Sequence, residues 1–177
     1  MIPSSSLLLI YTGSPIENFI TNELSLRKVN GMAGIWRWKT AQFAERNWWR
    51  QYLGGKDVET YLQWKREYWM QLIMKCEHYV DIKNANSILD AGCGPAGVFM
   101  LFQDKKIVAF DPLILLYETD LLHFKQSMYP AVQFIAQGFE NLELDQHFDL
   151  VFCMNAINHV QDIEKSMDVL VSKMESG

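Results

Sequence analysis

Short apolar runs alternate with amphipathic stretches over the second half of the chain. Such runs are typical of strands buried on both faces, and the intervening stretches show helical spacing. The alternation predicts a Rossmann-like, doubly wound parallel α/β sheet with right-handed crossovers, in the strand order 3-2-1-4. The predicted strands are 88–89, 106–110, 131–136 and 148–153. The helices predicted beside them are 98–102, 112–126 and 161–175.

Aromatic and apolar residues recur every three or four positions before this sheet. The pattern predicts a helix over Trp36–Leu53, ended by Gly54-Gly55, and a second helix from an N-cap at Asp57 to about Val80. Packing is the interpretation we favour for their aromatic rings. The alternative is that Tyr68 or Trp69 closes over a ligand.

The first residues have little periodicity and contain serine, proline and glycine turn formers. We therefore expect three regions: a poorly ordered leader over 1–33, an N-terminal helical cap over 34–80, and a ligand-binding domain over 81–177. Because regular patterning starts directly after Met32, we hypothesise that this methionine is the natural start and that the leader contributes nothing to the fold.

Charge is unevenly distributed along the 177 residues, whose net charge is −5. Between Arg27 and Lys75 there are ten basic and four acidic residues, whereas 81–177 holds six basic and fourteen acidic ones. We interpret this as two solvated surfaces that attract each other. A basic surface for an anionic substrate or nucleic acid is the alternative, but no nucleic-acid-binding motif is present, so we do not expect a nucleic acid partner.

The three cysteines have no metal-ligand spacing, and no apolar run is long enough to span a membrane. The cysteines predict reduced thiols in a cytoplasmic protein without a metal site. The lack of a membrane-spanning run predicts no membrane contact.

The candidate chemistry is concentrated in Ser87–Gly97, which reads Ser-Ile-Leu-Asp-Ala-Gly-Cys-Gly-Pro-Ala-Gly. Gly92, Gly94 and Gly97 match G-x-G-x-x-G, a turn between a strand and a helix that cradles a nucleotide cofactor. Cys93 fits this turn because its side chain is small. The N–H groups at the start of the helix favour a negatively charged ligand group. Both a nicotinamide dinucleotide and S-adenosylmethionine are compatible with this cradle.

Asp90 favours the second cofactor. A pyrophosphate bound at the turn would face this carboxylate at short range, whereas the ammonium of S-adenosylmethionine would complement it. An apolar pair, an acid and then G-x-G resemble the first motif of the class I S-adenosylmethionine-dependent methyltransferases, and the small-molecule type in particular. We therefore expect S-adenosylmethionine to be the cofactor.

Asp111 follows the second strand, where a carboxylate can accept hydrogen bonds from both ribose hydroxyls, and Pro112 begins the next helix. In the resembling family the loop after the third strand begins with an acid that contacts adenine. Here Gly138 stands at that place, so the resemblance leaves adenine to Gln137, Glu140 or the loop backbone around Phe139.

The segment 148–155 resembles the family's fourth motif. Asn155 and Ala156 should face the sulfonium and the methyl acceptor at the end of the strand. Asp149 opens this strand and is expected to be a turn or capping residue. His159 is the candidate catalytic residue, as a general base or a group that orients the acceptor; a structural role is the alternative.

The pattern ends before the fifth strand and the final antiparallel pair that members of this family usually have. We therefore expect a C-terminally truncated domain whose fourth strand leaves an exposed edge, through which the chain can self-associate. The predicted function is methyl transfer to a small-molecule acceptor. A nicotinamide-dependent oxidoreductase and a non-catalytic cofactor-binding or interaction module are the alternatives.

Overall fold

A five-stranded parallel sheet forms the centre of the computed structural model, which describes residues 6–10 and 32–174. Its strands are β1 Ser6–Ile10, β2 Ser87–Ala91, β3 Lys106–Phe110, β4 Val132–Ile135 and β5 Leu150–Met154. The α-helices are α2 Met32–Leu53, α3 Val58–Cys76, α4 Ile114–Asp120 and α5 Ile163–Ser172. Short 3-10 segments lie at Gly94–Ala96, Val98–Leu101, Gln126–Met128, Phe139–Asn141 and Ile157–His159.

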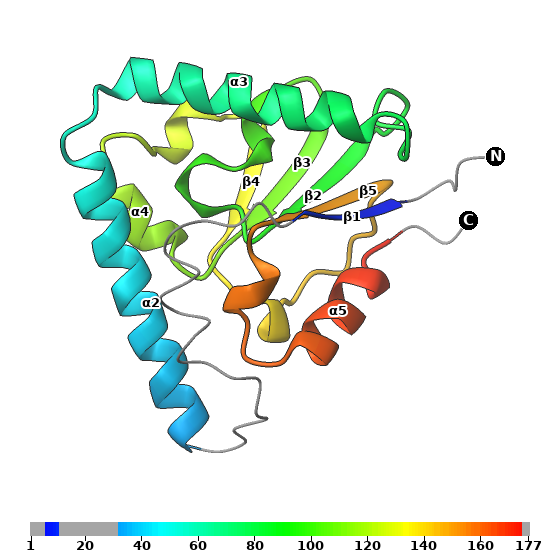
Figure 1. Cartoon of the computed structure of the whole chain (residues 1–177). Coiled ribbons are helices and arrows are strands. Elements are labelled where there is room, and N and C mark those ends of the chain that lie inside the picture. The colour runs from blue at the N-terminus through cyan, green and yellow to red at the C-terminus, as the bar shows by residue number, and fades with distance from the viewer. Residues whose placement is uncertain (1–5, 11–31, 175–177) are drawn as a thin grey trace.

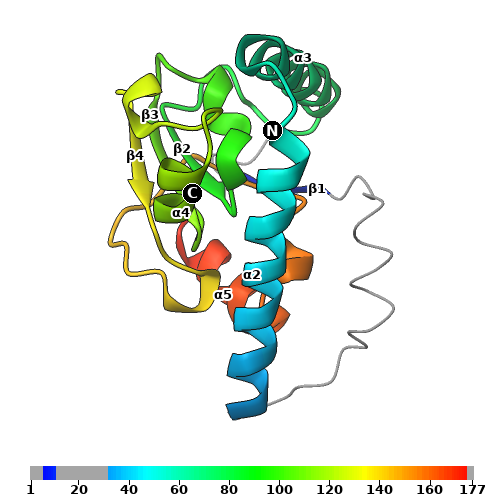
Figure 2. The ribbon, with the colours of Figure 1, turned by 90° about the vertical axis from the view of Figure 1, so that its left-hand side faces the viewer.

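The strand order is β1-β5-β2-β3-β4, with every neighbouring pair parallel. The four strands from β2 onward confirm the predicted order 3-2-1-4 and the Rossmann-like class. Helix α3 covers one face of the sheet and α5 the other, while α2 runs across the carboxyl ends of the strands (Figures 1 and 2). A ligand that binds at these strand ends is therefore close to α2.

Alternate residues of each central strand enter different cores, as expected for side chains that point to opposite faces. Ile88, Ile107 and Leu150 belong to the core beneath α3 and α4. Leu89 and Val108 belong to the core that packs against α5. Both faces of the sheet are thus buried, and this explains why the strands read as continuous apolar runs.

Strand β1 corrects two predictions. It lies inside the predicted leader and pairs with β5 from Ser6–Leu150 to Ile10–Met154. The prediction of a leader without regular structure is therefore wrong for residues 6–10, while residues 11–31 lie outside the described part. The expected exposed edge of the fourth predicted strand is also wrong, because β1 covers it. The predicted self-association through that edge therefore has no exposed strand to support it.

The N-terminal helices follow the sequence signals closely. Asp57 is the N-cap of α3, as predicted, and its Oδ1 accepts a hydrogen bond from the Thr60 N–H at 2.9 Å. The Gly54 N–H donates to the Arg50 carbonyl at 2.9 Å and ends α2. Helix α3 ends at Cys76, a few residues before the predicted end at Val80.

The helices within the sheet domain differ more. Instead of a helix after the glycine turn, the chain forms two 3-10 segments, Gly94–Ala96 and Val98–Leu101. Helix α4 spans only Ile114–Asp120 of the predicted 112–126. The residues after it belong to the aromatic core under α3, in which Phe124 contacts Phe99 and Phe134.

Candidate functional site

The glycine turn after β2 is the centre of the candidate site. Gly92 and Gly94 have φ values of 66° and 57°, a region that glycine enters without strain. The N–H groups of Gly92 and Cys93 both donate to the Phe110 carbonyl, at 2.8 and 3.1 Å. The turn is thereby held against the end of β3.

Three predicted site residues meet at Gly92. A Cβ added there would lie 2.3 Å from the Ala156 Cβ and 3.1 Å from the Phe139 ring. These neighbours come from the segment after β5 and the segment after β4. The missing side chain of Gly92 therefore lets the loops that follow three strands approach each other.

Asp111 connects the end of β3 to the same turn. Its Oδ2 accepts a hydrogen bond from the Gly94 N–H at 3.1 Å, and its Oδ1 accepts one from the Leu113 N–H at 2.8 Å. Burial, with a further contribution from the charge of Glu45, raises the pKa of Asp111 to about 7. Pro112 lies between Asp111 and Leu113 and is half-buried.

Asp90 is 1% exposed, and its carboxylate forms hydrogen bonds within the protein. Its Oδ2 accepts a hydrogen bond from the Phe99 N–H at 2.8 Å, which fixes the second 3-10 segment. A Cβ at Gly97 would lie 2.5 Å from this oxygen, so the third glycine of the motif makes room for the carboxylate. Burial raises the pKa of Asp90 to about 7.

The turn does not offer the anion cradle that the glycine motif predicts. A 3-10 segment takes the place of the expected helix, and the N–H groups of Gly92, Cys93 and Gly94 all donate within the protein. Burial also raises the pKa of the Cys93 thiol well above its ordinary value. Two carboxyl groups, Asp90 and Asp111, lie at the turn, and the charge of Lys65 on α3 acts on Asp90. The acids favour a positively charged ligand group.

Helix α2 supplies site residues that the sequence analysis missed. Glu45 is partly buried, and its Oε1 accepts a hydrogen bond from the Tyr117 hydroxyl at 3.3 Å. Burial raises the pKa of this carboxyl group. The Trp49 ring lies 3.7 Å from the position of a Gly94 Cβ, and the Trp38 ring 3.5 Å from that of a Gly138 Cβ. Periodicity marks α2 as a helix, but it does not show that these side chains face the turn.

Trp69 packs under the turn and does not close over it. It is 4% exposed, and its Nε1 donates a hydrogen bond to the Ala96 carbonyl at 2.8 Å. Packing is therefore confirmed for this ring, whereas the Trp49 ring of α2 lies next to Gly94.

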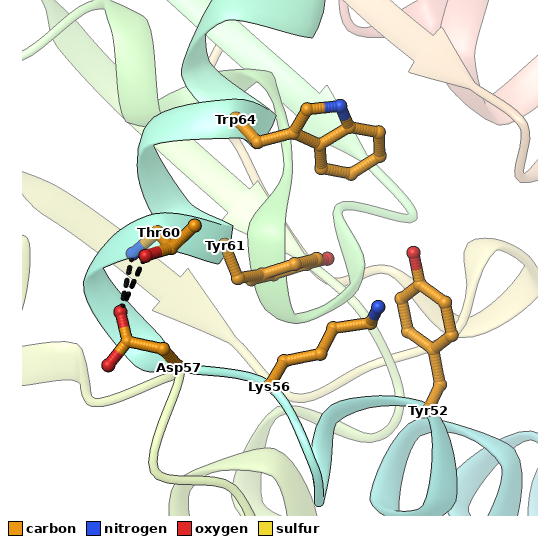
Figure 3. A pocket seen from close by; sticks show the side chains of 6 residues that line it. All are labelled: Tyr52, Lys56, Asp57, Thr60, Tyr61 and Trp64. Atoms are coloured by element: carbon orange, nitrogen blue, oxygen red, sulfur yellow. Dashed lines mark hydrogen bonds between the residues drawn. The ribbon is translucent and has the colours of Figure 1, made fainter.

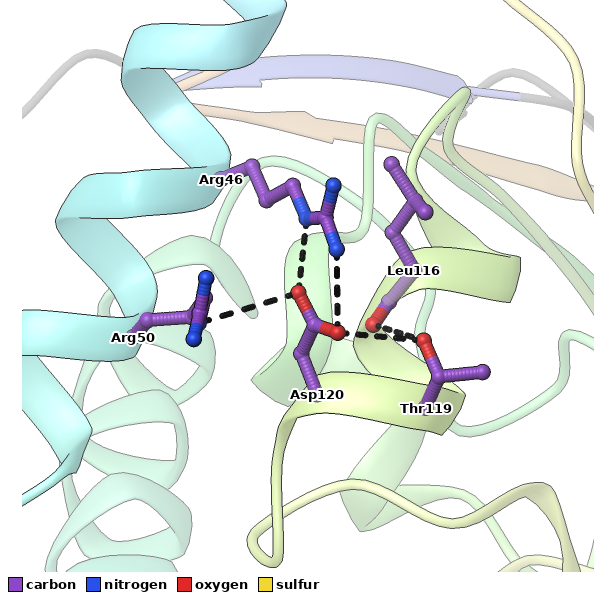
Figure 4. A network of polar contacts seen from close by, with 5 residues as sticks. All are labelled: Arg46, Arg50, Leu116, Thr119 and Asp120. Atoms are coloured by element: carbon purple, nitrogen blue, oxygen red, sulfur yellow. Dashed lines mark hydrogen bonds and ion pairs between the residues drawn. The ribbon is translucent and has the colours of Figure 1, made fainter.

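An ion-pair cluster holds α2 against α4 (Figure 4). Arg46 Nε and Nη2 lie 2.6 and 3.1 Å from the two oxygens of Asp120, and Arg50 Nε lies 3.9 Å from Oδ2. Thr119 Oγ1 donates to the Leu116 carbonyl and to Asp120. Because Arg46 binds both oxygens of Asp120 in a bidentate pair, the geometry of this ion pair is well defined.

The loop after β4 holds the residues predicted at adenine. Gln137 is half-buried, and its Oε1 accepts a hydrogen bond from the Glu143 N–H at 3.0 Å. Glu140 Oε1 accepts from the N–H groups of Gln161 and Asp162, at 2.6 and 3.0 Å. These contacts tie the loop to itself and to the start of α5.

The end of β5 carries Asn155, which has a φ of 57°, and His159, which is half-buried in a 3-10 segment. A left-handed backbone conformation is uncommon for a residue with a side chain, and it often marks a functional site. Asp149, at the other end of the strand, accepts hydrogen bonds from the N–H groups of Asn86 and Ser87. The predicted capping role of Asp149 is therefore confirmed.

A hollow of about 430 Å³ lies apart from these residues, where α2 meets α3 (Figure 3). Its walls include the rings of Tyr52, Tyr61 and Trp64, and the Lys56 ammonium lies 4.5 Å from the centre of the Tyr52 ring. None of the predicted site residues lines it.

Residues 6–10 and 32–174 contain no cluster of three His, Cys, Asp or Glu side chains that could hold a metal ion. No helix among them has the length and apolar character needed to cross a membrane.

The chain is similar to known methyltransferases. The ubiquinone biosynthesis O-methyltransferase of Rickettsia bellii is 30% identical over 100 residues, which cover 55% of this chain and 41% of that protein. The corresponding protein of Rickettsia felis is 29% identical and is covered to 40%. The chain thus spans about two fifths of the length of these relatives.

Among solved structures, an N-methyltransferase from Bradyrhizobium japonicum has the same fold. Its TM-score is 0.50 at 14% identity, and the match covers 72% of this chain and 67% of that one. A family model described as a methyltransferase domain matches residues 61–177. Because this match covers most of the chain, the chain belongs to the methyltransferase-domain family.

Proposed function

We propose that this protein binds S-adenosylmethionine at the glycine turn and transfers its methyl group to a small-molecule acceptor. The observation that carries the proposal is the set of acids around a turn whose Gly92, Cys93 and Gly94 N–H groups all donate within the protein. Asp111 accepts from the Gly94 N–H, Asp90 accepts from the Phe99 N–H, and the charge of Glu45 on α2 acts on Asp111. The family membership and the curated relatives support the same reaction.

This electrostatic arrangement suits one of the two cofactors that the glycine motif allows. A dinucleotide would bring a pyrophosphate close to carboxylates, at a turn whose N–H groups already donate elsewhere. S-adenosylmethionine carries an ammonium and a sulfonium, and both are stabilised by nearby negative charge. Its bound sulfonium supplies an activated methyl group.

The protein residues would then mainly position the reactants. Asp111 would accept hydrogen bonds from the ribose hydroxyls, and the missing side chains of Gly92 and Gly94 would allow close approach. Asn155 and Ala156 would face the reacting end. Holding reactants in line can lower a barrier by about 7–11 kcal/mol, so the reaction does not require a catalytic dyad.

His159 remains the candidate general base for an acceptor that must lose a proton. Such a base contributes about two to four powers of ten in rate. In this proposal residues 34–80 form a helical cap over the cofactor domain 81–177, and Gln137, Gly138 and Phe139 lie at the adenine. The cytoplasm is the expected compartment.

Isothermal calorimetry tests the cofactor. The purified chain should bind S-adenosylmethionine and S-adenosylhomocysteine but not NAD, and Gly94→Val should bind none of them, because a branched side chain would fill the turn at a positive φ. Binding of NAD alone would overturn the proposal in favour of hydride transfer. Methyl transfer to small-molecule fractions, followed with a labelled methyl group, then tests the reaction.

A further inference from the structure

Glu45 is a partly buried acid on helix α2, which precedes the sheet domain. It lies outside residues 61–177, which the methyltransferase model matches. Helix α2 runs across the carboxyl ends of the strands (Figure 1). From this helix the charge of Glu45 acts on Asp111. The two basic residues of α2 that follow Glu45, Arg46 and Arg50, both pair with Asp120.

The surroundings of Glu45 are those of a ligand-binding group. Its carboxylate accepts a hydrogen bond from the Tyr117 hydroxyl at 3.3 Å and one from the Trp49 side chain, and its two oxygens keep further acceptor capacity. Trp49, one turn further along the helix, covers Gly94. Tyr117 and Trp49 make an edge-to-face contact at 6.4 Å, so both rings flank the carboxylate.

Glu45 and Asp111 are close enough for the charge of Glu45 to act on Asp111. Like charges in a buried site destabilise the protein unless a donor group lies between them. Asp111 already accepts two backbone N–H groups and keeps further lone pairs toward the cleft. A vicinal diol, with two hydroxyl donors side by side, satisfies both acids at once.

We propose that Glu45 is a further cofactor-binding residue, whose carboxylate accepts a hydrogen bond from the ribose hydroxyls of the adenosyl ligand that Asp111 holds. This inference rests on the proposed function. It makes α2 a contributor to the cofactor site, in addition to being a cover over it.

The test compares two ligands by calorimetry. S-adenosylhomocysteine has the ribose and the amino-acid ammonium, while 5′-methylthioadenosine has the ribose alone. Glu45→Ala should weaken binding of both ligands about fivefold or more, and Glu45→Gln should weaken both by less, because its amide oxygen still accepts a neutral hydrogen bond. Thermal unfolding without ligand shows that each variant is folded.

Two control variants separate a contact with the ligand from a role in holding α2. Tyr117→Phe removes the hydroxyl that Glu45 binds but keeps the carboxylate, and it should bind both ligands within about twofold of the parent. Glu59→Gln, on the exposed first turn of α3, should bind like the parent.

Three results would overturn the inference. Equal losses in Tyr117→Phe and Glu45→Ala would make Glu45 a positioning residue for α2. A loss for S-adenosylhomocysteine alone would assign Glu45 to the ammonium, and parent-like binding by both Glu45 variants would remove it from the site. If the parent binds neither ligand, the proposed function itself has failed.

Discussion

Gly92 joins the loops of three strands because it has no side chain. Its φ is 66°, and a Cβ would lie 2.3 Å from Ala156 and 3.1 Å from Phe139. We expect Gly92→Ala to lower the free energy of unfolding by at least about 2 kcal/mol, from backbone strain and overpacking together. Gly55→Ala is the control: a Cβ there meets nothing within 4 Å, and the change should stay within about 0.5 kcal/mol. Chemical denaturation of both variants measures the difference, and equal stabilities would contradict it.

Asp90 should make the stability of the ligand-free protein depend on pH. Burial raises its pKa to about 7, above the ordinary value of an aspartate in an unfolded chain. Between these two values the folded protein holds a proton that the unfolded chain releases, so the free energy of unfolding falls as the pH rises from about 4 to 7. Asp111, with its pKa raised in the same way, acts in the same direction.

Asp90→Asn should flatten this dependence, because an amide oxygen can still accept from the Phe99 N–H but does not ionise. Thermal unfolding over the same pH range measures the slope, with the exposed Asp168→Asn as the variant that should keep it. If the melting temperature of the parent protein rises with pH over this range, the buried acids do not dominate the pH dependence of its stability.

Sequence reasoning at this scale was strongest where a residue type is required by the backbone. Gly92, Gly94 and Asp111 were singled out from spacing alone, and the structure brings them together. It was weakest for side chains whose orientation depends on tertiary packing. Glu45 and Trp49 are one turn apart on a helix with apolar residues on several sides, so no pattern marks the face that meets the turn.

The elements with strong local signals form where the sequence places them. The N-cap of α3 at Asp57 and strand β3 at Lys106–Phe110 agree with their predictions. The predicted helix after the glycine turn does not form; the chain makes a 3-10 segment there, and its Phe99 N–H donates to the buried Asp90 carboxylate. That interaction joins segments whose contact a local pattern does not contain.

Helix α2 should be held in place largely by its ion pairs with α4. Asp120 accepts both prongs of the Arg46 guanidinium. We expect Asp120→Asn to weaken the docking of α2 and to speed hydrogen exchange of its amides about fivefold. Asp168→Asn, an exposed change on α5, should leave these amides as they are. Hydrogen exchange followed by mass spectrometry measures these rates. Unchanged rates in Asp120→Asn would show that the aromatic contacts hold α2 in place.

On the scale of the whole molecule, β1 is the largest departure from the sequence-based picture. The parallel sheet and its order were predictable because buried strands alternate with helices. The pairing of β1 with β5 was not predictable, because no signal for so distant a partner is present in Leu7-Leu8-Leu9-Ile10. Pairing between remote segments depends on the sheet edge that is left free, and that is a property of the complete fold.

Removal of residues 1–10 should uncover the outer edge of β5 and promote self-association. Sedimentation velocity should show a larger associated fraction for this variant than for the full chain at the same concentration. Removal of residues 1–5 is the control, because it leaves every β1–β5 pair in place. A shortened chain that stays as monomeric as the parent would show that the β5 edge is protected in another way.

The pairing of β1 with β5 also sets an order of assembly. During synthesis the first strand leaves the ribosome long before its partner, so it stays unpaired while the rest of the domain is made. The β2–β3 and β3–β4 pairs join segments that are much closer in sequence, and closing these shorter loops costs less entropy. The β1–β5 pair is therefore the last part of the sheet to form, after residues 150–154 have been made.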